Sequence, residues 1–244
     1  MAKEWFENWF ETPYYAMLYR NRDDAEAEFF VKKLVAHLRL LPGNRVADVA
    51  CGSGRHSVVM NRLGLKVWGY DLSERFISEA RSLCSQAVFT IHDMRQAYHE
   101  TNMHAVFNLF TSFGYFATRE EDVLALSNMA GLLLGAEGVL VQDYINGLPI
   151  LPGLPIISTE ELNGVRFDIE KEWTHPYIVK KIRVTDREQN LEFEEKVRVY
   201  DAEELMSLHR EAGLEPVEVF GDYGLGTYQT LTSPRMIIVS KRKK

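Results

Sequence analysis

The 244-residue chain contains few cysteines and no long apolar run. Its two cysteines, Cys51 and Cys84, provide no disulfide framework and lack the spacing of paired metal ligands. No window of about 18 apolar residues is present, as a membrane span requires. The N-terminal region carries Glu4, Glu7 and Glu11 in place of a basic end followed by an apolar run, so no secretory signal is predicted. We therefore expect a cytoplasmic protein with no metal site and no membrane contact.

The chain also lacks an excess of basic residues. Its net charge is −7 and its isoelectric point is near 5.6. Extended binding to a nucleic-acid backbone requires a broad positive field, which this charge balance disfavours. The basic run 241–244 is predicted to be solvated. We expect a small-molecule substrate and no nucleic-acid partner.

The most informative segment runs from residue 46 to residue 73. Val46–Val49 is predicted as a buried parallel strand, and Gly52 and Gly54 let the next turn approach a ligand closely. The helix that begins near Arg55 directs its free N–H groups towards an anion. Asp71 ends the following strand, where a carboxylate is suited to accept both hydroxyls of a ribose. These features predict an adenosine-containing cofactor.

Several sequence motifs carry a resemblance to a known family. They are W-F-x-x-P-Y-Y at 9–15, D-x-x-C-G-x-G-R-H at 48–56, H-D-M-R at 92–95, N-L-F-T-S-F-G-Y-F at 108–116 and S-P-R at 233–235. With them the chain resembles the class I S-adenosylmethionine-dependent methyltransferases. Its pattern is similar to a bacterial small-molecule subgroup of undefined substrate, related to small-amine and glycine or sarcosine N-methyltransferases. The motif Asn-Pro-Pro-Tyr, which marks DNA amino-methyltransferases, is absent after the fourth strand.

The resemblance implies a reaction and a cofactor. S-adenosylmethionine would give its methyl group to a nitrogen or oxygen of a small molecule by in-line displacement, leaving S-adenosylhomocysteine. Two alternatives stay open. The first is an NAD(P)-dependent oxidoreductase, although Ser57 occupies the third glycine position of G-x-G-x-x-G and Asp93 follows the third strand. The second is a non-catalytic protein that binds the cofactor and acts as an interaction module.

The resemblance also implies which residues bind the cofactor. The glycine loop and Asp48 would hold the methionine end, Asp71 the ribose, and Asp93 with Met94 the adenine ring. Asp71 and Asp93 have a second interpretation as helix or turn caps. Ala50 stands where the family more often has glycine, a replacement that ordinary dihedrals would tolerate. The full set of candidate cofactor residues is Tyr15, Tyr19, Arg22, Asp48, Ala50, Cys51, Gly52, Ser53, Gly54, Arg55, His56, Asp71, Leu72, Asp93, Met94, Asn108 and Phe113.

No acid–base pair is evident in the sequence, and methyl transfer need not have one. Alignment of the reacting atoms and exclusion of water are expected to supply most of the catalysis. Weak candidates for a base or a substrate contact are His56, Tyr115, His175 and Arg235. Each has a structural interpretation too: packing beneath the loop, a pocket wall, a strand turn and a surface turn, respectively. The substrate, the accepting atom and the oligomeric state are not predicted.

The order of predicted elements indicates an α/β fold. Strands and helices alternate over the first 145 residues, which predicts a doubly wound, mostly parallel sheet in three layers. By the resemblance the sheet has seven strands with the last antiparallel, in a single domain spanning 1–244. Between 147 and 200, two-residue periods predict an insertion of three antiparallel strands, through which a homodimer could form if the protein is not a monomer. The aromatic N-terminal region, 1–40, is predicted as a helical lid or as ordinary packing.

Overall fold

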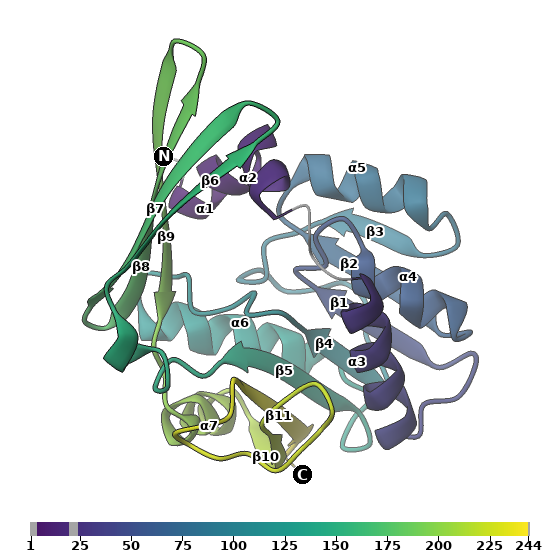
Figure 1. The fold of residues 1–244 in the computed structure, drawn as a ribbon. Helices are drawn as coiled ribbons and strands as arrows, with labels where there is room; N and C mark the ends of the chain where they lie inside the picture. Colours follow the sequence, from purple (N-terminus) through teal and green to yellow (C-terminus); the bar gives the residue numbers. More distant parts are fainter. Residues whose placement is uncertain (1–3, 20–23, 244) are drawn as a thin grey trace. The chain divides into compact units, whose positions relative to one another are not determined.

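The computed structural model describes residues 4–19 and 24–243, and it divides into two compact units. The core unit comprises residues 23–146 and 200–244, and the insertion unit comprises residues 1–22 and 147–199. Figure 1 shows the chain with its elements labelled. Among the described residues, no helix is both long enough and apolar enough to cross a membrane.

The core unit is built on a seven-stranded sheet of order β10-β11-β5-β4-β1-β2-β3. Its strands are β1 (Arg45–Val49), β2 (Lys66–Asp71), β3 (Val88–Ile91), β4 (Ala105–Asn108), β5 (Val139–Ile145), β10 (Leu214–Phe220) and β11 (Arg235–Arg242). The first five are parallel, and β11 runs antiparallel to both β5 and β10. The predicted fold class is confirmed in this respect.

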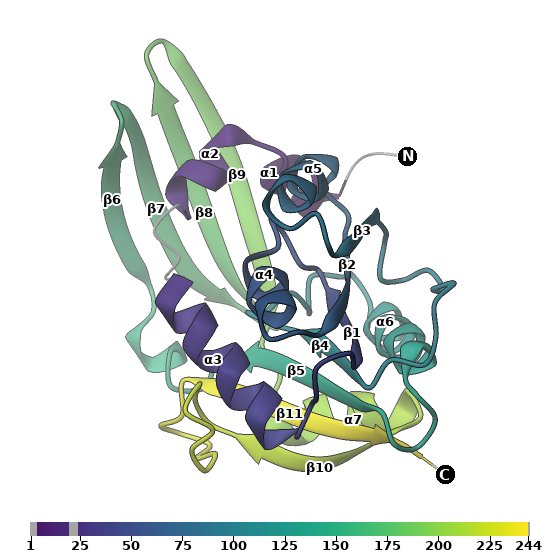
Figure 2. The same cartoon turned by 90° about the vertical axis from the view of Figure 1, so that its right-hand side faces the viewer.

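Five helices flank this sheet. They are α3 (Asp24–His37), α4 (Arg55–Arg62), α5 (Glu74–Leu83), α6 (Arg119–Leu132) and α7 (Ala202–Glu211). Helices α3, α4 and α5 pack on one face, and α6 and α7 pack on the other (Figure 2). The side chains of Ser73, Thr118 and Asp201 cap the N-termini of α5, α6 and α7, and the latter two form capping boxes. The three layers expected from the alternating pattern are therefore present.

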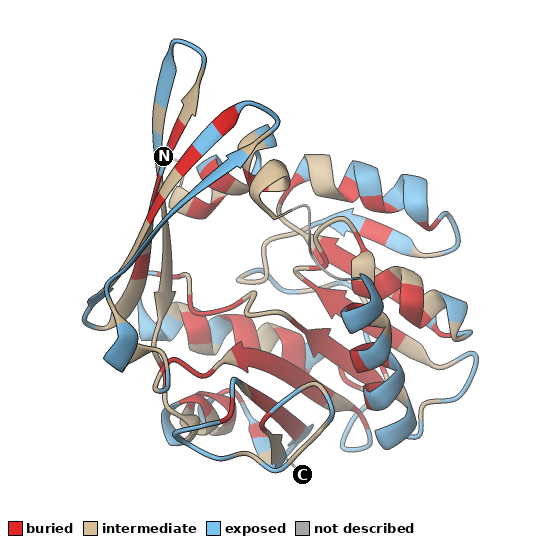
Figure 3. Cartoon of the chain, in the orientation of Figure 1, coloured by how far each residue is buried: buried red, intermediate tan, exposed pale blue. Residues whose placement is uncertain are grey.

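The centre of the sheet is fully buried, as the red ribbon of Figure 3 shows. Phe30 and Leu34 of α3 pack against Val46 of β1, Phe107 of β4 and Ile237 of β11, each at most 1% exposed. Parallel strands buried on both faces carry continuous apolar runs, which explains why these strands were readable in the sequence. The loops at their carboxyl ends consequently leave from a rigid base.

The insertion unit contains a four-stranded antiparallel sheet of order β6-β7-β8-β9. Its strands are β6 (Ile156–Leu162), β7 (Val165–Thr174), β8 (Tyr177–Asp186) and β9 (Gln189–Arg198), preceded by a short 3₁₀ helix, η1 (Leu151–Gly153). The last three correspond to the predicted strands. The edge strand β6 was not predicted, because six of its seven residues are exposed and show no apolar alternation.

Two short N-terminal helices, α1 (Trp5–Phe10) and α2 (Pro13–Leu18), belong to the same unit. The Trp9 ring lies on Phe193 of β9, with their centroids 4.6 Å apart. The Trp9 indole N–H donates to the Glu195 carboxylate at 2.6 Å, and the Tyr19 hydroxyl donates to it at 2.8 Å. The apolar face of the sheet thus carries the N-terminal helices.

Candidate functional site

The loop after β1 has the backbone expected of a ligand-binding turn. Gly52 and Gly54 have φ of 55° and 85°, and no atom lies within 4 Å of a Cβ built on Gly52. A Cβ on Gly54 would lie 3.1 Å from the Ala80 side chain of α5. Ala50 also has a positive φ, 58°, so the ordinary dihedrals assumed for this replacement of glycine are not found. The residue instead accepts left-handed strain.

Asp71, at the end of β2, is fixed beside this loop. Its Oδ2 accepts the Gly52 N–H at 2.8 Å, and its Oδ1 accepts the Ser73 N–H at 2.9 Å. The Ser73 contact is a local cap of the kind considered from the sequence, whereas the Gly52 contact reaches 19 residues back to the glycine loop. The carboxylate therefore orders the loop while it lies at the carboxyl edge of the sheet.

Asp48 and Ser57 form a buried pair beneath the loop. The Ser57 hydroxyl donates to Asp48 Oδ2 at 2.6 Å, and the two residues are at most 1% exposed. Burial raises the pKa of the Asp48 carboxyl to about 7, although the Ser57 hydrogen bond acts in the opposite direction. Ser57 stands at the position that a dinucleotide site gives to glycine, and it uses its side chain to hold the strand to α4.

Asn108, the last residue of β4, joins its strand to the end of β1, where the glycine loop begins. Its Nδ2 donates to the Val49 carbonyl at 3.1 Å and to the Ser112 carbonyl at 3.2 Å. Its Oδ1 is buried and has no hydrogen-bond partner among the described residues. An acceptor in that state is costly unless a ligand donates to it. Phe113, a further candidate, is 1% exposed and packs edge-on against Tyr144.

The predicted adenine site after β3 is held by an ion pair. Arg95 donates to both carboxylate oxygens of Asp93, at distances from 2.7 to 3.1 Å, and also contacts Glu121 of α6. Burial alone would raise the pKa of Asp93, but the Arg95 hydrogen bonds outweigh it and hold the pKa below its usual value. The Met94 carbonyl accepts from Asn128 at 3.3 Å. Arg95 belongs to the H-D-M-R motif, but the motif alone does not predict this ion pair.

The N-terminal candidates lie in the insertion unit. Tyr15 is buried among aromatic rings, 4.7 Å from Phe10 and 4.8 Å from Tyr19 between centroids. Tyr19 donates to Glu195 and accepts from Lys180 at 2.7 Å. Arg22 lies outside the described residues. The role of these three residues at a cofactor stays a prediction.

The weak catalytic candidates are placed as follows. The Tyr115 hydroxyl donates to the Thr111 carbonyl at 2.5 Å, and Arg235 donates to Asp143 at 2.7 Å. His56 is buried in the first turn of α4, where packing beneath the loop was its structural interpretation. His175 is exposed in the turn between β7 and β8.

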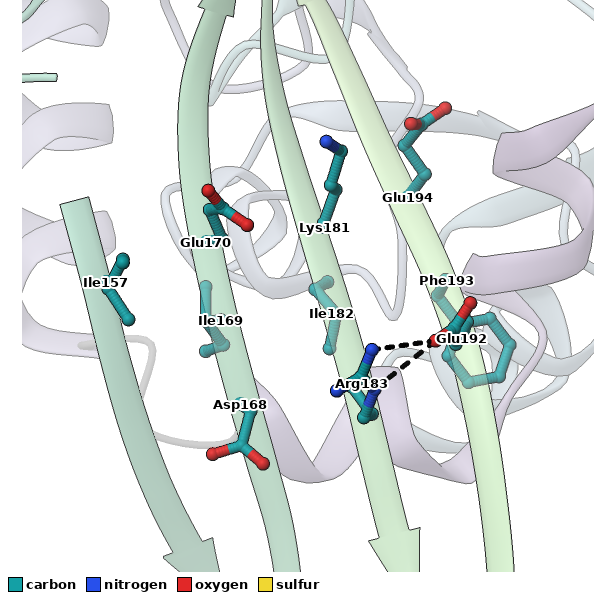
Figure 4. Close-up of a pocket in the computed structure, with 10 residues that line it drawn as sticks. All are labelled: Ile157, Asp168, Ile169, Glu170, Lys181, Ile182, Arg183, Glu192, Phe193 and Glu194. Atoms are coloured by element: carbon teal, nitrogen blue, oxygen red, sulfur yellow. Dashed lines mark hydrogen bonds and ion pairs between the residues drawn. The ribbon is translucent and has the colours of Figure 1, made fainter. Parts of the chain in front are cut away.

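A hollow on the insertion sheet is lined by charged side chains (Figure 4). Asp168, Arg183 and Glu192 face one another across three strands. Arg183 pairs with Glu192 at 3.1 Å while their side chains are 63% and 74% exposed. Ion pairs this exposed are solvated surface features of small energy. We assign no function to this hollow. In the described part of the chain, no cluster of three or more histidine, cysteine or acidic side chains is arranged to hold a metal ion.

Comparisons with known proteins agree with this geometry. Residues 46–134 match the family model described as a methyltransferase domain. A S-adenosylmethionine-dependent methyltransferase of Clostridium acetobutylicum superimposes with a TM-score of 0.79 over 98% of this chain and 99% of its own, at 16% identity. The chain has the class I methyltransferase fold. The resemblance identified in the sequence is thereby confirmed, and the comparisons give no support to the oxidoreductase alternative or the non-catalytic one.

Two further relatives of this methyltransferase fold are sugar methyltransferases. The sugar N-methyltransferase KedS8 from a Streptoalloteichus species has a TM-score of 0.71 and 22% identity, covering 94% of this chain and 93% of its own. The dTDP-3-amino-3,4,6-trideoxy-alpha-D-glucopyranose N,N-dimethyltransferase of Streptomyces venezuelae is 30% identical over 125 residues, or 51% of this chain and 52% of the relative. The chain thus spans about half the length of the curated relatives it matches.

Proposed function

We propose that this protein is a S-adenosylmethionine-dependent N-methyltransferase of a small-molecule amine. The observation that carries the proposal is the glycine loop fixed by Asp71 at the carboxyl edge of the sheet, through the 2.8 Å contact to Gly52. In open α/β sheets this edge is where nucleotide-like ligands bind. The two sugar N-methyltransferases among the relatives support nitrogen as the acceptor and a small molecule as the substrate.

The residues present fit S-adenosylmethionine. The open space in front of Gly52 leaves room for a ligand against the backbone, and the buried Asn108 Oδ1 is an acceptor to which no described residue donates. We propose that the loop from Ala50 to Gly54 receives the methionine end, Asp71 the ribose hydroxyls, and the segment of Asp93 and Met94 the adenine ring.

When bound, S-adenosylmethionine would supply an electrophilic methyl group: the amine lone pair would form the new N–C bond as the C–S electron pair returns to sulfur, and the methylated ammonium would release its proton to solvent water. The protein contributes by aligning the amine with the methyl group and by excluding water. Because the transition state spreads a positive charge that already exists, these two effects supply most of the catalysis. Tyr115 donates its hydroxyl to the backbone, and we assign no general base.

Cofactor binding is tested with S-adenosylhomocysteine by calorimetry and thermal shift. A ligand at 100 times its dissociation constant raises the free energy of unfolding by about 2.7 kcal/mol. Replacement of Asp71 by Asn removes a charged acceptor and is expected to weaken binding about 10- to 100-fold. The control Glu79→Gln alters an exposed pair with Arg75 on α5 and should leave binding unchanged. Stabilisation by NADH but not by S-adenosylhomocysteine would contradict the proposal.

Turnover is tested by release of S-adenosylhomocysteine from a panel of amines, carboxylates and phenols. The panel includes dTDP-3-amino-3,4,6-trideoxyglucose, glycine and sarcosine. Methylation of an amine supports the proposal. Methylation of phenols or carboxylates alone overturns the assignment of nitrogen, and tight cofactor binding with no turnover favours an interaction module.

The state of assembly and the location are further parts of this proposal. A homodimer through the antiparallel insertion is a prediction that sedimentation of the purified chain can decide. The cytoplasmic location likewise stays a prediction. The 1–40 lid and the single-domain organisation are proposals of the same kind.

A further inference from the structure

The turn that follows β4 has an unusual backbone. Phe110 and Thr111 are consecutive non-glycine residues with φ of 62° and 60°. This left-handed region is uncommon for any side chain and costly for a β-branched one such as threonine. Strain of this kind persists only where surrounding contacts impose it, and it is concentrated at functional sites.

Four hydrogen bonds impose the turn. The Phe110 N–H donates to Asp143 Oδ2 at 2.8 Å, and the Thr111 N–H donates to the Asp143 carbonyl at 3.0 Å. Arg235 donates through Nη2 to the Thr111 hydroxyl at 2.8 Å. The Tyr115 hydroxyl donates to the Thr111 carbonyl at 2.5 Å. Asp143 of β5 accepts two of these four hydrogen bonds.

Asp143 and Arg235 are themselves a buried ion pair. Arg235 Nε lies 2.7 Å from Asp143 Oδ1, and the two side chains are 14% and 1% exposed. The Tyr223 hydroxyl donates to Asp143 Oδ2 at 3.3 Å, and its ring packs on Phe30 of α3. Burying such a pair costs about as much desolvation energy as its attraction returns, so it contributes little net stability. Its geometric effect is to fix the turn to β5 and β11.

The turn borders the proposed cofactor loop. Strand β4 lies beside β1, and Asn108, two residues before Phe110, donates to the Val49 carbonyl. The Arg55 guanidinium, at the start of α4, lies 5.1 Å from the centre of the Phe110 ring. A displacement of the turn would therefore be felt next to the loop that receives the methionine end.

We propose that Asp143 and Arg235 are positioning residues that hold the Phe110–Thr111 turn as the surface against which the acceptor amine is aligned with the methyl group. This inference rests on the proposed function and deepens it. The pair acts through the turn, without touching the reacting atoms. Because misplacement of about 1 Å can cost 100-fold in rate, a turn held by hydrogen bonds to three residues fits the needs of an alignment-driven reaction.

The test separates the hydroxyl of Thr111 from its shape. Thr111→Val keeps the branched shape and removes the contact to Arg235, whereas Thr111→Ser keeps the hydroxyl. With the amine that the wild type methylates fastest in the panel above, we expect kcat to fall about 10-fold in Thr111→Val and to stay within twofold in Thr111→Ser. The dissociation constant of S-adenosylhomocysteine should stay within twofold in both.

A second variant removes the ion pair without leaving one buried charge alone. The double replacement Asp143→Leu with Arg235→Met is expected to fold, because apolar pairs of similar volume replace buried ion pairs at little cost. Its kcat should fall about 100-fold with binding of S-adenosylhomocysteine retained. Ser240 is fully buried on the same strand, β11. The control Ser240→Ala removes its hydrogen bond to His209, yet should keep kcat.

The outcomes distinguish this proposal from the function it rests on. Unchanged kcat in Thr111→Val and in the double variant overturns the positioning role alone. Binding that weakens in parallel with kcat also overturns it, since the residues would then act through the cofactor. A wild type that binds S-adenosylhomocysteine and methylates no amine overturns both proposals together.

Discussion

Ala50 occupies a backbone conformation that glycine adopts more readily. Its φ of 58° places it in the left-handed region at the start of the glycine loop, residues 50–54. The left-handed conformation costs a residue with a Cβ about 1–2 kcal/mol. The motif showed that glycine was replaced, but the dihedral depends on how β1 and α4 are joined in three dimensions, so the sequence could not predict it.

Replacement of Ala50 by Gly is expected to raise the free energy of unfolding by about 0.5–1 kcal/mol. Relief of strain exceeds the extra backbone entropy that glycine gives to the unfolded chain. Urea denaturation of the apoprotein measures the difference. Ala47→Gly, three residues earlier within β1, is the control and should be destabilising. Equal losses in both variants would show that position 50 carries no strain.

Asp143 is the residue of the candidate site that sequence analysis missed. It lies within the apolar run of β5, where one acidic residue reads as the end of a buried strand. Its importance comes from contacts with Phe110, 33 residues away, and Arg235, 92 residues away. Contacts this distant leave no local pattern. By contrast, Gly52, Gly54 and Asp71 lie within one strand–helix–strand unit, so their spacing in the sequence is enough to predict them as a site.

At the scale of elements, features that depend on neighbouring residues are easier to predict than the packing of one element on a distant one. The caps at Ser73, Thr118 and Asp201 each need only a side chain and an N–H three residues further along the chain. The association of α1 and α2 with β9 involves residues about 180 positions apart. Periodicity in the N-terminal segment could show an apolar face but not the surface that covers it.

Glu195 joins these helices to the sheet, and its loss is expected to release them. Glu195→Ala would leave the Trp9 indole and the Tyr19 hydroxyl without their shared acceptor and would remove the ion pair with Lys180 at 3.8 Å, at a cost of about 2–3 kcal/mol. Hydrogen exchange should accelerate in α1 and α2. Glu192→Ala removes an exposed carboxylate three residues earlier on β9 and should change little. Unaltered exchange in the first variant would show that ring packing alone holds the helices.

At the scale of the whole molecule, two buried groups give opposite pH dependence. Burial lowers the pKa of His209 to about 3 from 6.5, while its ring contacts Ser240 and Gln142. Its contribution to stability is complete above pH 6.5 and is lost as the pH falls towards 3. Asp48, with a pKa raised from 3.8 to about 7, contributes fully below pH 3.8 and less as the pH rises to 7. The two slopes cancel between these limits.

Single variants should expose the hidden slopes. Relative to the wild type, His209→Gln is expected to lose about 1.4 kcal/mol of unfolding free energy per unit of rising pH between about pH 4 and 6.5. Asp48→Asn should gain about the same amount per unit. Denaturation at a series of pH values provides the measurement. His99→Gln, at an exposed position, should run parallel to the wild type. Parallel curves for all three variants would contradict the assignment.

Both thiols of the chain lie in one packed cluster of the core unit. Cys51 and Cys84 contact Ile77, Ala80 and Phe89, and burial raises the pKa of the Cys51 thiol well above its ordinary value. The Cys51 thiol is therefore a poor nucleophile in the folded protein, and Cys84 is buried beside it. An alkylating reagent can reach these thiols only when α5 and β3 separate near the glycine loop. The rate of alkylation therefore measures how often this part of the native protein opens, with no added label.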